Sequence, residues 1–180
     1  YPALIAFAMT VSNVLLMENY QTLMVALQIF LLSLSQILLL VILVKFRIHN
    51  FAKILILFYF AISPSIVNSG LSLYSEIATY PIVLSIILLA MIMVKKFHTV
   101  KWNAAFSYGI LFGFYFLLIT AVKGIFELFF PIYLGLFLVI LMLIARTQKK
   151  SIFVNALFFL LAAIMVFYIP ILSYKKANFA

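Results

Sequence analysis

A single glutamate stands in a polar stretch of an otherwise apolar sequence. Residues 68–81 read NSGLSLYSEIATYP, and the residues around Glu76 that carry hydroxyl groups are Ser72, Tyr74, Ser75, Thr79 and Tyr80. The chain has only three acidic residues, which are Glu18, Glu76 and Glu127. A carboxylate among hydroxyl groups could take a proton from a substrate or shape a polar pocket. Glu76 is therefore the first candidate site residue.

Few other side chains offer chemistry. His49 and His98 lie beside lysines and far from any acid, so they indicate neither a metal site nor a catalytic triad. The sequence contains no cysteine, which excludes disulfides and thiolate metal sites. The ionisable residues that remain with Glu76 are Lys123, Glu127, Lys175 and Lys176. The plainer interpretation is that these glutamates mark helix ends and these lysines reach lipid headgroups.

The composition shows what positions these residues. The 180 residues are 69% hydrophobic and 8% charged, with a mean hydropathy of +1.35, and a water-soluble domain needs far more polar surface. Charged residues separate six uncharged runs of 18 to 26 residues, whereas about 20 residues of helix cross a bilayer core. The runs do not alternate polar and apolar residues as barrel strands do. The predicted fold is therefore an all-α, polytopic transmembrane helix bundle of six spans. The predicted spans are 21–44, 54–68, 78–94, 103–122, 126–145 and 152–172.

We expect one membrane-embedded domain over residues 1–180, as part of a longer chain, because the sequence starts at Tyr1 without a basic signal-peptide region. Residues 1–17 are short for a span and polar in the middle, which favours an interfacial helix over a crossing one. Pro81 suits the first turn of a helix, so the third span is expected to start near it. Pro170 is expected near the outer end of the last span.

The basic residues predict the orientation. Nine of the twelve lie in alternate connectors, namely Lys45, Arg47, Lys53, Lys95, Lys96, Lys101, Arg146, Lys149 and Lys150. Loops rich in Lys and Arg stay in the cytoplasm, so Glu76 is predicted to face the extracytoplasmic side. The net charge of +9 suits anionic membrane lipids as partners. No basic and aromatic stripe outside the membrane indicates nucleic acid.

Two glycines share one face of a predicted helix. Gly109 and Gly113 stand four residues apart in GILFG. Small residues at this spacing let two helices approach closely. We interpret them as a packing contact without chemistry.

The order of features resembles the polyprenyl-phosphate-sugar-dependent glycosyltransferases of the GT-C fold, such as protein O-mannosyltransferases and lipid A aminoarabinose transferases. The matching segments are Tyr1–Pro2, ISPSIVNSGLSLYSE at 62–76, GILFGFYFLLITAVKGIFELFFP at 109–131 and IPILSYKKANF at 169–179. The resemblance covers essentially the whole chain. One departure is Ile171 after Pro170, where the family often has tryptophan, and this weakens the match of Lys175.

The resemblance implies an enzyme that moves a sugar from a polyprenyl-phosphate donor to a lipid, glycan or protein acceptor. The site would face the extracytoplasmic side of a bacterial or archaeal inner membrane. Glu76 matches the family's second acidic position, with the main general base expected upstream of Tyr1, so this piece alone is expected to be inactive. Lys123 matches the family's basic turn and Lys175 lies near another of its basic positions, and the resemblance implies that both contact the donor phosphate. Tyr74 and Tyr80 complete the predicted substrate site. A divalent cation is a possible cofactor, and the residues leave its site unknown.

Three other classes of membrane protein stay open. A transporter or flippase of lipid-linked sugars also needs an outward cavity, although the sequence has no internal repeat. A polysaccharide polymerase shares the substrates, although such enzymes usually have long external loops. A non-enzymatic membrane scaffold would leave the polar residues of the outer side without a purpose.

Overall fold

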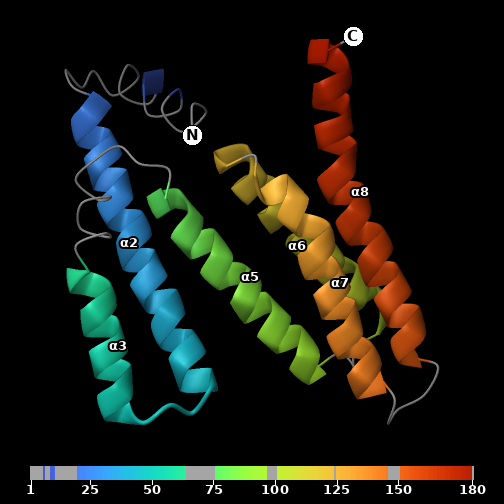
Figure 1. Ribbon diagram of the computed structural model, residues 1–180, viewed down its shortest axis with the longest axis horizontal. Coiled ribbons are helices and arrows are strands. Elements are labelled where there is room, and N and C mark those ends of the chain that lie inside the picture. Colours follow the sequence, from blue (N-terminus) through green and yellow to red (C-terminus); the bar gives the residue numbers. More distant parts are fainter. Residues whose placement is uncertain are drawn as a thin grey trace. The chain divides into compact units, whose positions relative to one another are not determined.

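Most of the chain that can be described is helical. A computed structural model describes residues 6, 9–10, 20–63, 76–96, 101–123, 125–145 and 151–179 (Figure 1). The helices are α2 (Tyr20–Lys45), α3 (Asn50–Ile62), α5 (Glu76–Lys96), α6 (Trp102–Val122), α7 (Phe126–Ala145) and α8 (Ser151–Phe179). The described residues contain no strand, which confirms the all-α prediction.

Four of the described helices are long and apolar enough to cross a membrane. The segments with this length and hydropathy are Gln21–Lys45, Ile77–Lys95, Trp102–Val122 and Phe153–Ala177. Two shorter apolar helices are described at Asn50–Ile62 and Phe126–Ile140. Helices of this kind satisfy their own backbone hydrogen bonds in lipid, so the chain is an integral membrane protein. The count of six spans and the GT-C class stay predictions. The interfacial helix predicted over 1–17 falls largely outside the described residues.

A tight turn reverses the chain between α2 and α3. Arg47 adopts a left-handed backbone conformation with a φ of 55°. Its N–H donates to the carbonyl oxygen of Val44, and the N–H of Ile48 donates to that of Leu43. This is the Schellman pattern that closes many helix C-termini, usually with glycine in the left-handed position. The turn lets α2 and α3 pack side by side.

Sequence explains both ends of α3. The His49 side chain accepts a hydrogen bond from the N–H of Phe51 and caps the first turn. The helix ends at Ser63, which has an extended backbone (φ −55°, ψ 122°). Ser63 precedes Pro64, and a proline disfavours the helical conformation of the residue before it. At 13 residues and 1.5 Å of rise per residue, α3 is about 20 Å long.

Two proline expectations are wrong. The third span was expected to start near Pro81, but α5 starts at Glu76 and holds Pro81 inside it. A proline this close to the start removes only one helix hydrogen bond, so the helix extends past it. Pro170 was expected near a helix end, but α8 continues through it to Phe179. Its lost hydrogen bond is offset by the intact turns on either side.

Contacts group the chain into two compact units. The first comprises Tyr1–Ser85 and Ala121–Lys123, and the second comprises Ile86–Thr120 and Gly124–Ala180.

In the first unit, α2 buries a face that is partly polar. Its buried residues include Met24, Gln28, Ser35 and Ile42, which are spaced by four or seven and therefore share one side of the helix. The Ser35 hydroxyl donates a hydrogen bond to the carbonyl oxygen of Leu31 at 2.7 Å. This bond satisfies a hydroxyl that would otherwise be costly to bury.

In the second unit, phenylalanines fill the space between α6, α7 and α8. The buried members of this aromatic core are Phe112, Phe116, Phe130, Phe137, Phe159 and Phe167. The rings of Phe130 and Phe167 stack with centroids 3.9 Å apart, and Phe112 lies 5.9 Å from Phe137 and 5.4 Å from Phe159. Lipid is as apolar as these rings, so their contribution comes from close packing rather than from removal of water.

The ring pairs fix the directions of the three helices. Trp102 of α6 contacts Phe158 of α8, and Phe116 of α6 contacts Phe167 of α8. The contacts follow the same order along both helices. Thus α6 and α8 run parallel. On α7, Phe130 meets Phe167 while Phe137 meets Phe159. The order is reversed, so α7 runs antiparallel to α8.

Candidate functional site at the helix ends

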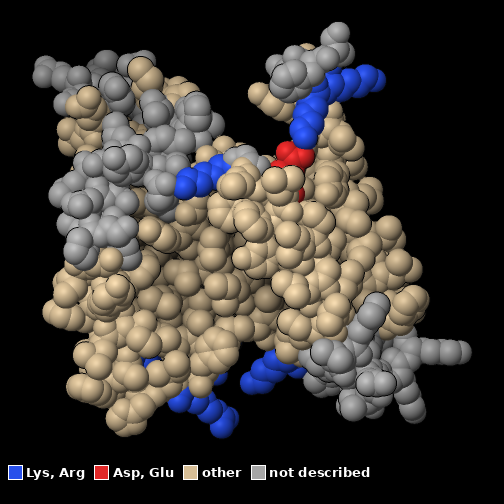
Figure 2. Space-filling view, in the orientation of Figure 1, with Lys and Arg blue, Asp and Glu red and all other residues tan. Residues whose placement is uncertain are grey.

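The charged residues of the described chain lie at helix ends, and the surface between these ends is uncharged (Figure 2). Lys45, Arg47 and Lys53 surround the turn between α2 and α3. Lys95 and Lys101 flank the connection between α5 and α6. Because charges inside a hydrocarbon layer are costly, this distribution is the one a membrane-embedded bundle requires.

Trp102 marks a membrane boundary at the start of α6. Its side chain is exposed, and its ring lies 5.1 Å from that of Phe158. Tryptophan side chains favour the level of the lipid headgroups. Lysine side chains such as that of the neighbouring Lys101 favour the same level. From Trp102 to Val122, α6 has 21 residues, which span about 30 Å and match a hydrocarbon core.

Glu76 is the first residue of α5. Acidic residues are favoured at this position because the N-terminus of a helix carries a partial positive charge. Of its predicted polar neighbours, Thr79 is buried and Tyr80 is half-buried. Tyr74 and the serines before Glu76 fall outside the described residues, so the structure leaves the predicted pocket untested.

Tyr80 makes a packing contact within the first unit. Its ring meets that of Phe60 edge to face, with centroids 5.8 Å apart. This contact ties α3 to the first turns of α5. The observed contact is a packing contact, and the substrate-binding role of Tyr80 stays a prediction.

Lys123 follows α6 directly and is half-buried. The helix ends at Val122, so the lysine stands in the short connection before α7. A lysine at the C-terminal end of a helix is favoured by the negative end of the helix dipole. Lys123 therefore holds its cation at the end of α6 opposite to Lys101.

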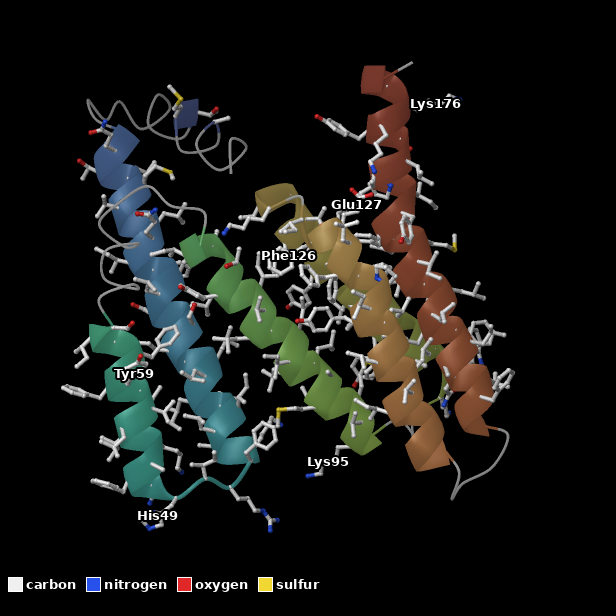
Figure 3. All side chains as sticks on the ribbon, in the orientation of Figure 1. His49, Tyr59, Lys95, Phe126, Glu127 and Lys176 are labelled. Atoms are coloured by element: carbon white, nitrogen blue, oxygen red, sulfur yellow. The ribbon has the colours of Figure 1, made fainter. Side chains whose placement is uncertain are left out.

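Lys175 pairs with Glu127. The Nζ atom of Lys175 lies 2.6 Å from Oε1 of Glu127 and donates a hydrogen bond to it. Half of the Lys175 side chain and 29% of the Glu127 side chain are exposed. Glu127 stands in the first turn of α7, and in Figure 3 it is labelled at the end of this helix beside α8. The ion pair therefore joins α7 to the C-terminal part of α8 at one end of the second unit.

From the sequence, Lys175 is predicted to contact a phosphate, and its ion pair with Glu127 is not predicted. The Phe130–Phe167 contact places Glu127 at the level of position 170 on the antiparallel α8. Lys175 is five residues further along, or about 7.5 Å. Side chains on a helix lean toward its N-terminus. Lys175 therefore leans along α8 toward the level of Glu127. Glu127 leans toward the start of α7, which is the direction in which Lys175 lies. The two lean toward each other, and this signal could have been used once the antiparallel arrangement was predicted.

A metal site is not visible in the described part of the chain. Among these residues, no group of three or more His, Cys, Asp and Glu side chains comes together to hold an ion. The divalent cation of the sequence-based hypothesis therefore stays a proposal.

The comparisons with known proteins add no assignment. No protein family, curated protein sequence or solved structure matches the chain. The function is therefore inferred from the residues and their placement.

Proposed function

We propose that the chain is the membrane-embedded part of a glycosyltransferase that moves a sugar from a polyprenyl-phosphate donor to a lipid, glycan or protein acceptor. The reaction takes place on the extracytoplasmic face of a bacterial or archaeal inner membrane. The resemblance to the GT-C enzymes in the order of motifs suggests this reaction. The placement of three candidate residues is the observation that supports it.

Each of the three residues lies at one end of a helix, and the other end of that helix carries or adjoins basic residues of the predicted cytoplasmic connectors. Glu76 begins α5, whose other end carries Lys95, and Lys123 follows α6, whose other end follows Lys101. Lys175 lies in the last turns of α8, opposite to the predicted basic connector before that helix. A lipid-linked donor needs cations for its phosphate at the level of the headgroups and a carboxylate close to the transferred sugar. Helix ends on one side of a membrane can supply both.

Each residue has a role that follows from its chemistry. Lysine offsets the charge of a phosphate as a point charge with rotatable donors, which suits Lys123 and Lys175. A carboxylate at position 76 would orient the acceptor or donor by accepting hydrogen bonds from sugar hydroxyls. Tyr74 and Tyr80 add hydroxyl groups and flat apolar surface, a combination that suits a sugar ring.

The direct test is transfer in a reconstituted membrane. The full-length protein is placed in liposomes with a polyprenyl-phosphate donor carrying a radiolabelled sugar and with a lipid extract as acceptor. We expect the label to move to an acceptor while free polyprenyl phosphate accumulates. If the labelled donor stays intact and only changes leaflet, the protein is a flippase instead.

A further inference from the structure

We propose that Lys175 binds a lipid phosphate, and that this phosphate takes the place of the Glu127 carboxylate with which Lys175 pairs in the structure. The site comprises Lys175 and Glu127, with Lys176 next to Lys175 on α8. The ligand is a phosphate group at the headgroup level of the membrane. That it belongs to the polyprenyl donor rests on the function proposed above.

The ion pair can open at little cost. Lys175 and Glu127 bond at 2.6 Å, yet half of the Lys175 side chain is exposed. Water solvates both charges when such a pair separates, so exposed pairs contribute little to stability. A phosphate offers more acceptor oxygens to the ammonium group than one carboxylate oxygen does. The exchange therefore replaces a partly exposed ion pair, whose net contribution to stability is small, by a contact with more acceptor oxygens.

Glu127 keeps favourable surroundings after the exchange. It stands in the first turn of α7, where backbone N–H groups have no partner within the helix and the helix dipole is positive. The carboxylate also keeps access to water, because 29% of its side chain is exposed. Release of Lys175 thus leaves no buried, unpaired charge. This is the condition that lets a pair act as a replaceable contact.

The length of α8 puts Lys175 at the right depth. The apolar segment of α8 runs over Phe153–Ala177, and Lys175 is 22 residues after Phe153, or about 33 Å along the helix. A hydrocarbon core is about 30 Å thick, so the ammonium group reaches the layer where lipid phosphates lie. Lys176, the next residue of α8, is also exposed, and Figure 3 labels it near the C-terminal end of this helix. It adds a second positive charge that attracts an anionic headgroup.

Two kinds of lipid could supply the phosphate, and binding measurements separate them. The full-length protein is purified in dodecyl maltoside, which contains no phosphate. It is then titrated with a polyprenyl monophosphate or with phosphatidylglycerol, and bound lipid is counted by native mass spectrometry. The variants are Glu127→Gln, Lys175→Gln and Lys175→Arg. Lys101→Gln, at the start of α6, is the matched control for the loss of one positive charge.

The two partners are expected to act in opposite directions. Glu127→Gln frees Lys175 and should lower the Kd for polyprenyl monophosphate at least threefold. Lys175→Gln should raise this Kd at least fivefold, whereas Lys175→Arg and Lys101→Gln should leave it within about twofold. A purely structural ion pair predicts weaker binding in both glutamine variants. That result, or an unchanged Kd in Glu127→Gln, would overturn the exchange.

The choice of lipid tests the proposed function separately. Preference for polyprenyl monophosphate over phosphatidylglycerol assigns the site to the donor. Equal binding of both lipids, with the opposite effects of the two variants intact, supports the exchange but assigns it to ordinary headgroups. In that case the role of Lys175 in the transferase fails while the phosphate site stands.

Discussion

The backbone of Gly113 in α6 lies directly against that of Ala163 in α8. A Cβ atom added at Gly113 would come 2.6 Å from the carbonyl oxygen of Ala163 and 3.1 Å from its Cα atom. One helical turn earlier, a Cβ atom at Gly109 would overlap the carbonyl oxygen of Phe159. Both obstacles are backbone atoms, which cannot turn aside as a side chain could. The contact therefore sets the distance between α6 and α8.

The first prediction concerns this contact. Gly113→Ala should lower the free energy of unfolding by about 1–3 kcal/mol, because the added methyl group forces the two helices apart. The change is measured by thermal unfolding of the purified full-length protein in detergent, with size-exclusion chromatography as the readout of the folded fraction. The matched control is Gly135→Ala in α7, where a Cβ atom meets nothing within 4 Å. There we expect no loss, since alanine favours a helix over glycine by up to about 1 kcal/mol. Equal losses in both variants would contradict the account.

The second prediction concerns the aromatic core of the second unit. Phe167 is fully buried and stacks on Phe130, whereas Phe153 on the same helix is 71% exposed. Phe167→Ala should cost roughly 2–4 kcal/mol of stability, because it leaves a cavity among packed rings. Phe153→Ala should change stability by less than about 0.5 kcal/mol. The same unfolding assay measures both variants, and a larger effect at Phe153 would count against the packing described here.

The positions of the helices could be predicted because charges are so costly in a membrane. Each uncharged run contains a helix, and α7 begins at Phe126 beside Glu127, as the pattern of charges indicates. The pair of glycines in α6 also predicted a close packing contact, and the structure confirms it. Its partner α8 could not be predicted, since an apolar helix offers several faces with small residues.

Other features depend on geometry that local sequence rules do not contain. Pro81 and Pro170 lie inside helices because neighbouring turns hold the chain helical around one missing hydrogen bond. The Glu127–Lys175 pair joins residues 48 positions apart, and it forms because the two side chains lean in opposite directions. Charge counting alone could not show that the two residues meet.

The third prediction tests Glu76 in the proposed enzyme. Glu76→Gln in the full-length protein should lower the rate of sugar transfer at least tenfold, because the amide cannot carry the negative charge. The amount of protein in the membrane, measured by immunoblot, should not change. Full activity of Glu76→Gln would remove Glu76 from the site.

The fourth prediction separates donor binding from chemistry at Lys123. Lys123→Met keeps most of the length of the side chain and removes its charge. The KM for the polyprenyl-phosphate donor should rise at least fivefold, while kcat should fall less than threefold, because a phosphate contact made before and during transfer mainly affects binding. Steady-state kinetics with varied donor concentration measures both. An unchanged KM would contradict a phosphate contact.

The predicted orientation and the proposed transferase are tested most directly by finding the side of the membrane on which Glu76 lies. The sequence contains no cysteine, so single cysteines at positions 76 and 101 can be labelled without background from this part of the chain. A membrane-impermeant maleimide is added to intact cells and, separately, to inside-out vesicles. We predict that position 76 is labelled from outside the cell and position 101 only in the vesicles. Labelling of position 76 only in the vesicles would contradict both the orientation and the proposed transferase.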